Sequence, residues 1–335
     1  MLPVMVTEGK ARCGVVVGKF NPPHLGHLYL IERGAARVDR LFVLLCDRPD
    51  QSIPVGLRQR WLEDVVSANV SILVTPDDLP AANEPWASRT LDVLPEPPDL
   101  AFTSEKWGPG WATSMGAEHV MVDLDRTVFP VSGTALRADL RANFEWLVPS
   151  ARAGLARRVV MVGAESSGKS TLAEGLAAEL GTVWVPEHGR CYWEGRRHLG
   201  NQAWASDEFV RIAHAQRRLQ EDLARKASNG VIVADTDALV TAVWRERYLG
   251  IADPELDALA EGWVPDLYLV CRPDFDWVQD GTRESEANRD EMQASMERRV
   301  YASGAEVEVL SGHHEERLVK ALAAIEAGTE FEELI

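Results

Sequence analysis

Short apolar runs alternate along this chain with segments in which apolar residues recur every three or four positions. The first pair is an apolar run at 13–20, which predicts a buried strand, and a helical pattern from Leu25 through Leu28 and Ile31 to Ala35. Further strands are expected at 41–46, 70–74, 100–102 and 120–122, with a helix at 57–66. The stretch 76–98 is rich in proline and acidic residues, which predicts a loop with one short helix. Strands that alternate with helices are typical of a parallel, doubly wound sheet.

A second series of alternating elements begins at Arg157. Its expected strands are 159–162, 183–185, 231–234 and 267–270, and its expected helices are 169–180 and 204–227. Because this series opens with a glycine-rich loop of its own, it predicts a second domain. We place the boundary between Leu147 and Arg157, where Pro149, Ser150 and Gly154 interrupt the periodicity. The expected fold class is α/β, with domains at 1–150 and 156–335 that each form a doubly wound parallel sheet.

Composition narrows the class of protein further. The net charge of −17 repels nucleic-acid phosphates, and the basic residues are scattered, so no nucleic-acid partner is expected. No apolar run reaches the ~18 residues of a membrane span, and the N-terminus has no secretory pattern, which predicts a cytoplasmic protein without a membrane partner. Three of the four cysteines fall in apolar runs, which predicts buried, reduced thiols. The oligomeric state stays open, a homo-oligomer included.

The segment GKFNPPHLGH, from Gly18 to His27, lies where the first strand gives way to the first helix. Ligand sites of open parallel sheets lie at the carboxyl ends of such strands. His24 and His27 stand three residues apart at the helix start, so they share a face. The backbone N–H groups there favour anions, and two imidazoles could donate hydrogen bonds to phosphate oxygens under attack. Two unrelated histidines near a turn are the alternative.

A second segment, VSGTALR at 131–137, adds polar groups of the same kind. Ser132 and Thr134 are good N-cap residues, and Arg137 would then lie one turn inside a helix, within reach of a phosphate. A plain helix cap is the alternative. Lys19 could add charge near the same phosphates, or it could be an exposed lysine without a role.

These two segments together resemble the nucleotidyltransferase superfamily that carries a His-x-Gly-His motif. The fixed positions of that motif are present as Gly18, Phe20, Pro22, His24, Gly26 and His27. The resemblance implies that the motif holds ATP and stabilises a pentacovalent transition state, while the acceptor phosphate attacks directly and pyrophosphate leaves. It also implies that Ser132, Thr134 and Arg137 contact the β- and γ-phosphates.

The second domain carries GAESSGKS at 163–170, which fits the P-loop pattern G-x-x-x-x-G-K-[ST] at every fixed position. It follows an expected strand and opens an expected helix. Lys169 would reach the β- and γ-phosphate oxygens, and Ser170 would bind Mg²⁺. A glycine-rich turn with a chance lysine is the alternative. The predicted ATP-binding residues here are Gly163, Glu165, Ser166, Ser167, Gly168, Lys169, Ser170, Thr171, Arg283 and Arg289.

Other candidates follow the ends of strands. Asp235 could hold Mg²⁺ directly or through water, whereas Asp237 could equally cap the next helix. Glu187, beside Arg190, could orient or deprotonate an acceptor hydroxyl, or it could be a solvated loop acid. Arg283 and Arg289 lie in the polar segment 280–291, which could be a lid whose arginines neutralise a transferring phosphoryl group. Solvated arginines on a helix are the alternative to that role.

Taken together, the two halves resemble the bifunctional NadR family of NAD biosynthesis. Further matching runs are 116–119 (GAEH) leading to Asp125-Arg126, 129–134 (FPVSGT), 235–237 (DTD) and 280–283 (DGTR). The resemblance implies that the second domain phosphorylates ribosylnicotinamide with ATP and that the first transfers AMP from ATP to nicotinamide mononucleotide. Mg²⁺ would be the cofactor, and ATP, ribosylnicotinamide, nicotinamide mononucleotide and NAD would be the small-molecule partners.

The residues and the resemblance together give one expected set of catalytic residues, which comprises His24, His27, Lys169, Glu187 and Asp235. The ribosylnicotinamide site is expected from Glu187, Arg190, Asp235 and Asp237.

Two departures accompany this resemblance. Enteric members carry an N-terminal helix-turn-helix domain, whereas about a dozen residues precede the first strand here, so no DNA-binding regulation is expected. His188 also stands where an aromatic residue that stacks on nicotinamide is expected. The rival readings are an adenylyltransferase with an inactive or differently specific kinase half, and a nucleotide sensor without turnover.

Overall fold

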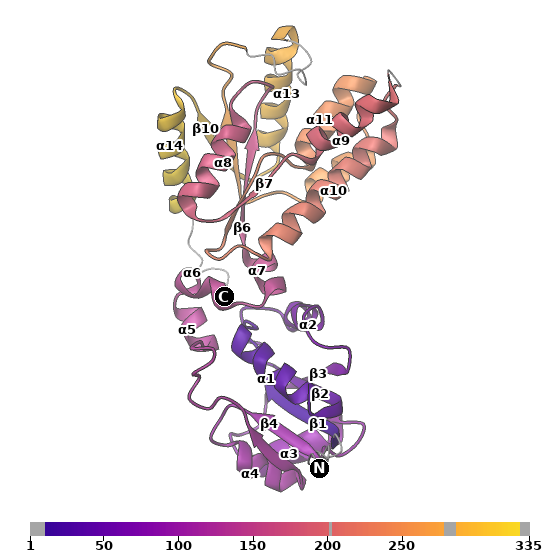
Figure 1. Ribbon diagram of the computed structural model, residues 1–335, viewed down its shortest axis with the longest axis vertical. Coiled ribbons are helices and arrows are strands. Elements are labelled where there is room, and N and C mark those ends of the chain that lie inside the picture. The colour runs from indigo at the N-terminus through magenta and orange to yellow at the C-terminus, as the bar shows by residue number, and fades with distance from the viewer. Residues whose placement is uncertain (1–10, 201–202, 278–285, 329–335) are drawn as a thin grey trace, which may run out of the picture. The chain divides into compact units, whose positions relative to one another are not determined.

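The computed structural model describes residues 11–200, 203–277 and 286–328. It forms two compact units, one ending at Ala151 and the other beginning at Arg152 (Figure 1). The division falls inside helix α7 (Pro149–Leu155). This division lies within the interval expected for the boundary, between Leu147 and Arg157, and Pro149 opens the helix there, where its missing N–H group costs nothing.

The first unit is built on a sheet of five parallel strands. They are β1 (Ala11–Gly18), β2 (Val38–Asp47), β3 (Val70–Pro76), β4 (Leu100–Thr103) and β5 (Glu118–Met121). Their order is β3-β2-β1-β4-β5, so the chain reverses direction across the sheet at β1, whose neighbours are β2 and β4. A crevice for ligands is expected at the carboxyl end of β1 for this reason.

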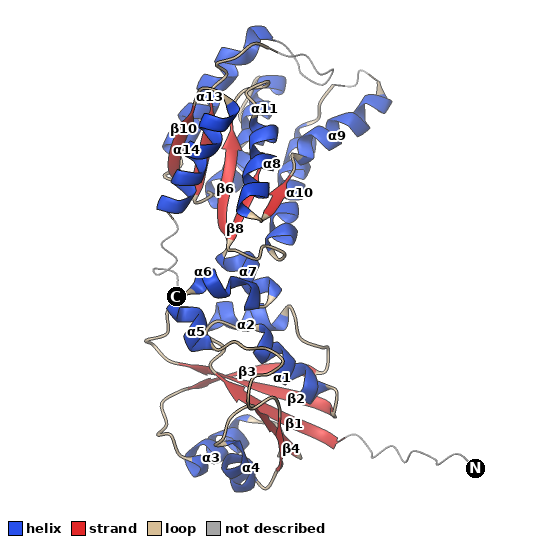
Figure 2. Ribbon diagram, turned by 60° about the vertical axis from the view of Figure 1, so that its left-hand side comes forward, coloured by secondary structure: helices blue, strands red, loops and turns tan. Residues whose placement is uncertain are grey.

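Helices cover both faces of this sheet. Figure 2 shows α1 (Leu25–Ala35) and α2 (Val55–Glu63) on one side, with α3 (Asn83–Val93) and α4 (Gly108–Met115) on the other. Successive residues of β1 face opposite layers, so Val16 packs with Ile31 of α1 while Val15 packs with Trp111 of α4. After β5 come α5 (Gly133–Ala138), α6 (Leu140–Asn143) and the 3₁₀ turn η1 (Phe144–Trp146).

The second unit has its own sheet of five parallel strands, in the order β10-β9-β6-β8-β7. The strands are β6 (Arg157–Val162), β7 (Val183–Val185), β8 (Val231–Ala234), β9 (Leu267–Cys271) and β10 (Glu306–Leu310). The helices are α8 (Lys169–Leu180), α9 (His188–Arg196), α10 (Ser206–Ala224), α11 (Ala238–Leu249), α12 (Pro254–Gly262), α13 (Arg289–Ala302) and α14 (His314–Ala327). Two short 3₁₀ turns, η2 (Arg197–Leu199) and η3 (Glu286–Asn288), complete the described elements.

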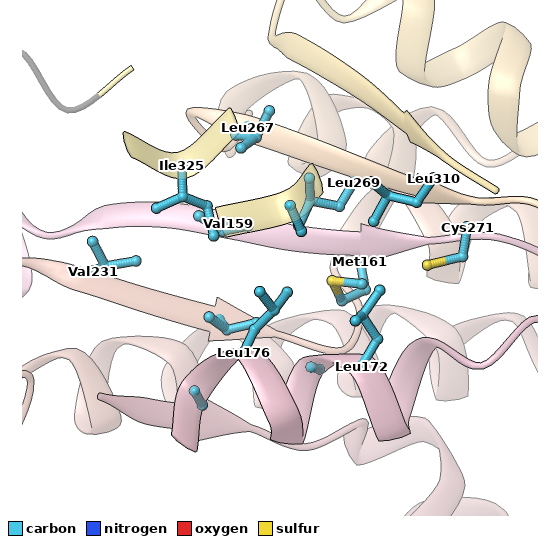
Figure 3. Close-up of a cluster of buried hydrophobic side chains, with 14 residues drawn as sticks. Val159, Met161, Leu172, Leu176, Val231, Leu267, Leu269, Cys271, Leu310 and Ile325 are labelled. Carbon is cyan, nitrogen blue, oxygen red and sulfur yellow. The ribbon is translucent and has the colours of Figure 1, made fainter. Parts of the chain in front are cut away.

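The core of the second unit explains why these elements form. Figure 3 shows Val159 and Met161 of β6 packed with Leu172 and Leu176 of α8, and with Ile325 of α14. Helices α10, α11 and α12 form a further apolar cluster. The predicted α/β class with two parallel-sheet domains is confirmed.

Some elements of the structure differ from those expected from the sequence. Helix α3 fills eleven residues of the stretch expected to be mostly loop. Strand β10 and helix α14 were not predicted. Cys13, Cys46 and Cys271 are buried free thiols as expected, and Cys191 is exposed. No helix in the described ranges is long and apolar enough to cross a membrane.

Candidate active sites

The two histidines of the first unit hold each other in place at the start of α1. His24 is the N-cap, and its Nδ1 accepts from the backbone N–H of His27, while His27 Nδ1 accepts from the N–H of His24, both at 3.3 Å. The rings stack with centroids 3.5 Å apart, and the edge of Phe20 approaches His27 at 4.8 Å. The helix start thus fixes both imidazoles without any partner outside the motif.

The motif glycines make room for these rings. A Cβ on Gly26 would lie 3.1 Å from His24 Nδ1, and one on Gly18 would lie 3.0 Å from the Phe20 ring. Phe20 itself has a φ of 47°, a backbone conformation that residues other than glycine seldom adopt. Gly18 therefore allows the close approach of an aromatic ring.

Burial decides the protonation of the pair. It lowers the pKa of His24 to about 3, with a further contribution from the positive charge of Arg126. Burial also lowers the pKa of His27 well below its usual value, helped by His24 and Arg126. Both rings are therefore neutral at pH 7. Because each Nδ1 accepts a hydrogen bond, the proton sits on Nε2, and each ring keeps one N–H donor.

A cavity of about 570 Å³ opens beside the histidines. Its walls include three indoles, Trp86, Trp107 and Trp111, and several charged side chains from the loops that follow the strands. Of the predicted nucleotide-binding residues, six line it: Gly18, Lys19, Phe20, His24, Gly26 and His27.

Two residues of the second predicted segment, Val131 and Gly133, line this cavity, whereas its candidate phosphate contacts Ser132, Thr134 and Arg137 do not. Ser132 caps α5 by accepting from Ala135 N at 3.1 Å, and Thr134 is exposed. Arg137 donates to the carbonyl of Asn21 at 2.6 Å and lines a neighbouring cavity of about 330 Å³. Lys19 lines both cavities and pairs with Asp77 at 3.1 Å. The segment is thus joined to the motif loop, with Lys19 where the two cavities meet.

In the second unit the P-loop runs from β6 into α8 as predicted. Lys169 Nζ donates to Ala164 O at 2.9 Å, and Ser167 Oγ donates to the same carbonyl at 2.7 Å. Gly163 has a φ of 153°, and a Cβ there would lie 2.5 Å from the carbonyl oxygen of Cys271. A side chain at this position would therefore collide with β9.

Two carboxylates gather at the P-loop. Ser170 Oγ donates to Asp235 Oδ2 at 2.5 Å, and Asp235 is 3% exposed with an Oδ1 that has no hydrogen-bond partner. Burial raises the pKa of Glu187, and the charge of Asp235 raises it further, while Lys169 and Arg190 lower it. Glu187 lies 4.0 Å from Arg190 across one helical turn.

A cavity of about 170 Å³ joins the P-loop to an aromatic wall. Glu187 and Arg190 line it together with the predicted loop residues Gly163, Glu165, Ser166, Ser167, Gly168, Lys169, Ser170 and Thr171. The wall comprises Trp193, Trp204, Phe209, Trp244 and Tyr248. His188 does not line this cavity, and the aromatic surface expected at that position is supplied by these other residues.

Asp237 and Arg289 make contacts other than those expected of them, and Arg283 is not tested. Asp237 caps α11 by accepting from Val240 N and takes a 2.5 Å hydrogen bond from Tyr268 in the core. Neither Asp237 nor Asp235 lines the cavity, so we remove both from the ribosylnicotinamide site, and Asp235 keeps only its expected role beside Ser170. Arg289 donates to the carbonyls of Ser166 and Phe275 at 2.7 and 2.8 Å, which ties the P-loop to the segment after β9. Arg283 and the DGTR run at 280–283 lie outside the described residues.

Three arginines that were given no role from the sequence support these sites. Arg58 lies beneath the loops after β1 and β2, and Arg126, which stands in the matching run Asp125-Arg126, lines the larger cavity. Arg317 is 3% exposed and donates to the carbonyls of Ser167, Gly312 and Arg272 at 2.8–2.9 Å. No local pattern distinguishes Arg58 and Arg317 from surface arginines.

Comparison with known proteins follows the same division. Residues 15–88 match the cytidylyltransferase-like family, and residues 158–317 match the AAA domain family. The chain is 32% identical over 312 residues to the trifunctional NAD biosynthesis/regulator protein NadR of Escherichia coli, covering 85% of this chain and 75% of that protein.

Solved structures agree in fold. A NadR protein in complex with NR superposes with a TM-score of 0.71 at 22% identity, covering 95% of this chain and 96% of that chain. A NadR protein in complex with NAD and AMP-PNP gives a TM-score of 0.67 at the same identity and coverage. On the strength of the sequence identity over most of its length, this chain belongs to the NadR family of NAD biosynthesis enzymes.

Proposed function

We propose that the 570 Å³ cavity of the first unit joins nicotinamide mononucleotide to ATP, giving NAD and pyrophosphate, and that the P-loop cavity of the second unit makes that mononucleotide from ribosylnicotinamide and ATP. The chain is a bifunctional enzyme of NAD biosynthesis, as its family membership establishes. The observation that carries the assignment is the pair of neutral imidazoles at a helix start in one unit, with the Ser170–Asp235 contact at a P-loop in the other.

In the adenylyl transfer, the histidines act as donors and do not exchange a proton. Their Nε2–H groups are aimed at oxygens on the α-phosphorus, whose negative charge grows as the acceptor phosphate attacks. Fixed donors of this kind need no reorganisation during the reaction, which is why they stabilise a transition state. Lys19, at the junction of the two cavities, supplies charge for the phosphates, and Arg137 lines the side that suits the leaving pyrophosphate.

The cationic ring of nicotinamide suits the indoles of the first cavity. Trp107 is exposed at its edge, and an indole face is the aromatic surface that attracts cations most strongly. The carboxylates of Asp77 and Glu105 in the same lining add to that attraction.

In the kinase, Ser170 and Asp235 fit Mg²⁺. The buried Asp235 Oδ1 has no protein partner, and the hydroxyl of Ser170 lies against the other carboxylate oxygen, so hard oxygen donors converge at one point. Within the described ranges no three His, Cys, Asp or Glu side chains gather as a complete metal site. That suits Mg²⁺, which takes one or two protein ligands and completes its shell with water and phosphate. When bound, it would offset charge on the transferring phosphoryl group.

Glu187 is the proposed base for the ribose 5′-hydroxyl. It lines the cavity with Lys169 and Ser170. Burial raises its pKa toward neutral pH, and a general base works best when its pKa is near the pH of the reaction. The aromatic wall would hold the nicotinamide ring on the other side, with Trp204 and Tyr248 stacked 5.4 Å apart.

Separate variants test the division of labour. His27→Ala should lower NAD formation from nicotinamide mononucleotide by about 10²–10³-fold, the usual cost of one transition-state donor, while phosphorylation of ribosylnicotinamide persists. Lys169→Ala should give the reverse result. Each variant is incubated with ATP and Mg²⁺, once with ribosylnicotinamide and once with nicotinamide mononucleotide as the acceptor, and nicotinamide mononucleotide, NAD, ADP and pyrophosphate are quantified.

The rival readings give different products. An inactive kinase half would leave ribosylnicotinamide unchanged in the wild-type incubation while added nicotinamide mononucleotide still became NAD. A nucleotide sensor would form neither product. Equal loss of both activities in either folded variant would contradict two independent sites.

A further inference from the structure

Arg126 is a positively charged residue of the first cavity, and the proposed adenylyl transfer does not yet use it. It lines the cavity with His24 and His27, and its charge acts on both rings. It pairs with Glu105, another lining residue, at 3.1 Å. Within the described part of the chain, Lys19 and Arg126 are the cationic side chains of this lining.

The backbone presents Arg126 in a defined way. Its φ of 52° is unusual for a residue with a side chain, and such conformations persist where the surroundings enforce them. Asp123 enforces this one by accepting from Thr127 N, Thr127 Oγ1 and Val128 N at 2.8–3.1 Å, while its carbonyl accepts from Arg126 N at 3.0 Å.

The end of the same loop is anchored beside the histidine motif. The Phe129 ring packs against Tyr29 of α1 at 5.6 Å and against Trp146 at 6.4 Å. A Cβ on Gly26 would lie 3.7 Å from Phe129 Cβ. Arg126 therefore lies on a loop that is held by internal hydrogen bonds and whose end, at Phe129, packs against helix α1.

The two cavities of the first unit differ in their cationic side chains. Arg137 lines the smaller cavity and not the larger, Arg126 lines the larger and not the smaller, and Lys19 lines both. The reacting α-phosphorus belongs at the junction. The leaving polyphosphate then lies toward Arg137, and the attacking phosphate of the acceptor lies on the side of Arg126.

That attacking phosphate needs a cation which the histidines do not provide, because both are neutral. A phosphate monoester carries about −1.5 to −2 charges at pH 7, and Arg is the side chain best matched to it, through two parallel hydrogen bonds. Glu105 is a weak competitor, since the side chains of the pair are 43% and 49% exposed and exposed pairs contribute little. An arriving phosphate can therefore take over the guanidinium.

We propose that Arg126 binds the 5′-phosphate of the acceptor mononucleotide and exchanges Glu105 for it when the acceptor enters. The proposal rests on the adenylyltransferase function proposed above. It makes Arg126 a specificity residue, because it lets the site prefer the phosphorylated product of the kinase to the unphosphorylated nucleoside.

The test compares a ligand with and without the 5′-phosphate, on proteins with and without the Arg126 guanidinium. Adenylyl transfer is run backwards from NAD and pyrophosphate at initial rate, where little ATP is present to feed the kinase. Nicotinamide mononucleotide and ribosylnicotinamide are compared as inhibitors of the wild type, Arg126→Ala and Arg126→Lys. Arg40→Ala is the matched control, because it breaks an Arg–Glu pair in the same unit, with Glu96, that lines neither cavity.

Arg126→Ala should raise the inhibition constant of the mononucleotide about 10- to 100-fold, as expected for hydrogen bonds to a charged group, and leave that of the nucleoside within about twofold. Arg126→Lys should fall between Ala and the wild type, and Arg40→Ala should match the wild type. Equal rises for both inhibitors, no rise for either, or a rise confined to the KM of pyrophosphate would each overturn the assignment. A wild-type enzyme that forms no NAD would instead refute the adenylyltransferase function itself.

Discussion

Arg58 provides the sharpest test of how the first unit holds its active-site loops. Its side chain is fully buried, and it donates to the carbonyls of Ile53 at 2.9 Å, Lys19 at 2.5 Å and Cys46 at 3.1 Å. It also donates to the side chains of Asp47 and Gln51 at 2.8 and 2.7 Å. One guanidinium thus joins the loop of the histidine motif to the loop that follows β2.

We expect Arg58→Ala to destabilise the first unit by about 3–5 kcal/mol. The variant leaves three carbonyls without this donor, each at a cost of about 1–3 kcal/mol before water enters. The lost ion pair with Asp47 adds little, because the Asp47 side chain is 39% exposed. For a unit of about 150 residues, each kcal/mol shifts Tm by about 2–4 °C. The expected fall is therefore about 10 °C, within a range of about 6–20 °C.

The two activities of the chain provide an internal reference for this measurement. Samples are heated in steps, and NAD formation and ribosylnicotinamide phosphorylation are then assayed on the same protein. The midpoint for loss of NAD formation should fall in Arg58→Ala, while the midpoint for loss of the kinase should stay. Arg60→Ala is the control, because Arg60 lies two residues further along the same helix and is exposed. Equal midpoints for the two variants would show that the buried contacts of Arg58 do not hold this unit together.

Three further predictions concern the chemistry. Glu187→Gln should lower kinase kcat by about 10²–10⁴-fold with the KM for ATP nearly unchanged. It should also remove the acidic limb of the pH profile, because a base with a raised pKa loses activity as falling pH protonates it. Full kcat with a higher KM for ribosylnicotinamide would make Glu187 a binding residue. Asp235→Asn should raise the Mg²⁺ concentration needed for half-maximal kinase activity, and an unchanged metal titration would remove Asp235 from the metal site. Gly26→Ala should lower NAD formation by displacing the His24 ring, from which the new Cβ would lie 3.1 Å, and wild-type activity would show that the ring adapts.

The parts of this structure that were predicted from the sequence are those written in local patterns. Buried parallel strands appear as apolar runs, so β1, β6 and β8 were expected within a few residues of where they lie. The P-loop and the histidine motif are short strings whose mechanics depend on neighbouring residues. Each was expected on a loop between a strand and a helix, and each lies there.

The parts that were missed depend on contacts between distant segments. Asp235 and Asp237 both follow the same strand, but only Asp237 accepts a hydrogen bond from Tyr268. Tyr268 lies 31 residues further along the chain, so no local pattern separates the two acids. Strand β10 alternates charged and apolar residues at the edge of the sheet, so it has no continuous apolar run to reveal it. Arg289 was expected in a lid over phosphate, but it also donates to the carbonyls of Phe275 and Ser166, contacts that its place in a polar segment does not reveal.

The buried arginines show a common physical reason for what sequence patterns omit. A loop that leaves a parallel sheet presents carbonyls which no strand or helix can pair, and an unpaired buried carbonyl is costly. A guanidinium has five donors in one plane, so a single residue can satisfy several such carbonyls at once. Arg58 does this for the loops after β1 and β2, and Arg317 does it for the P-loop and the segments after β9 and β10. The geometry of each active site therefore depends on an arginine that lies as far as 150 residues from the motif it supports, where no local pattern can reveal it.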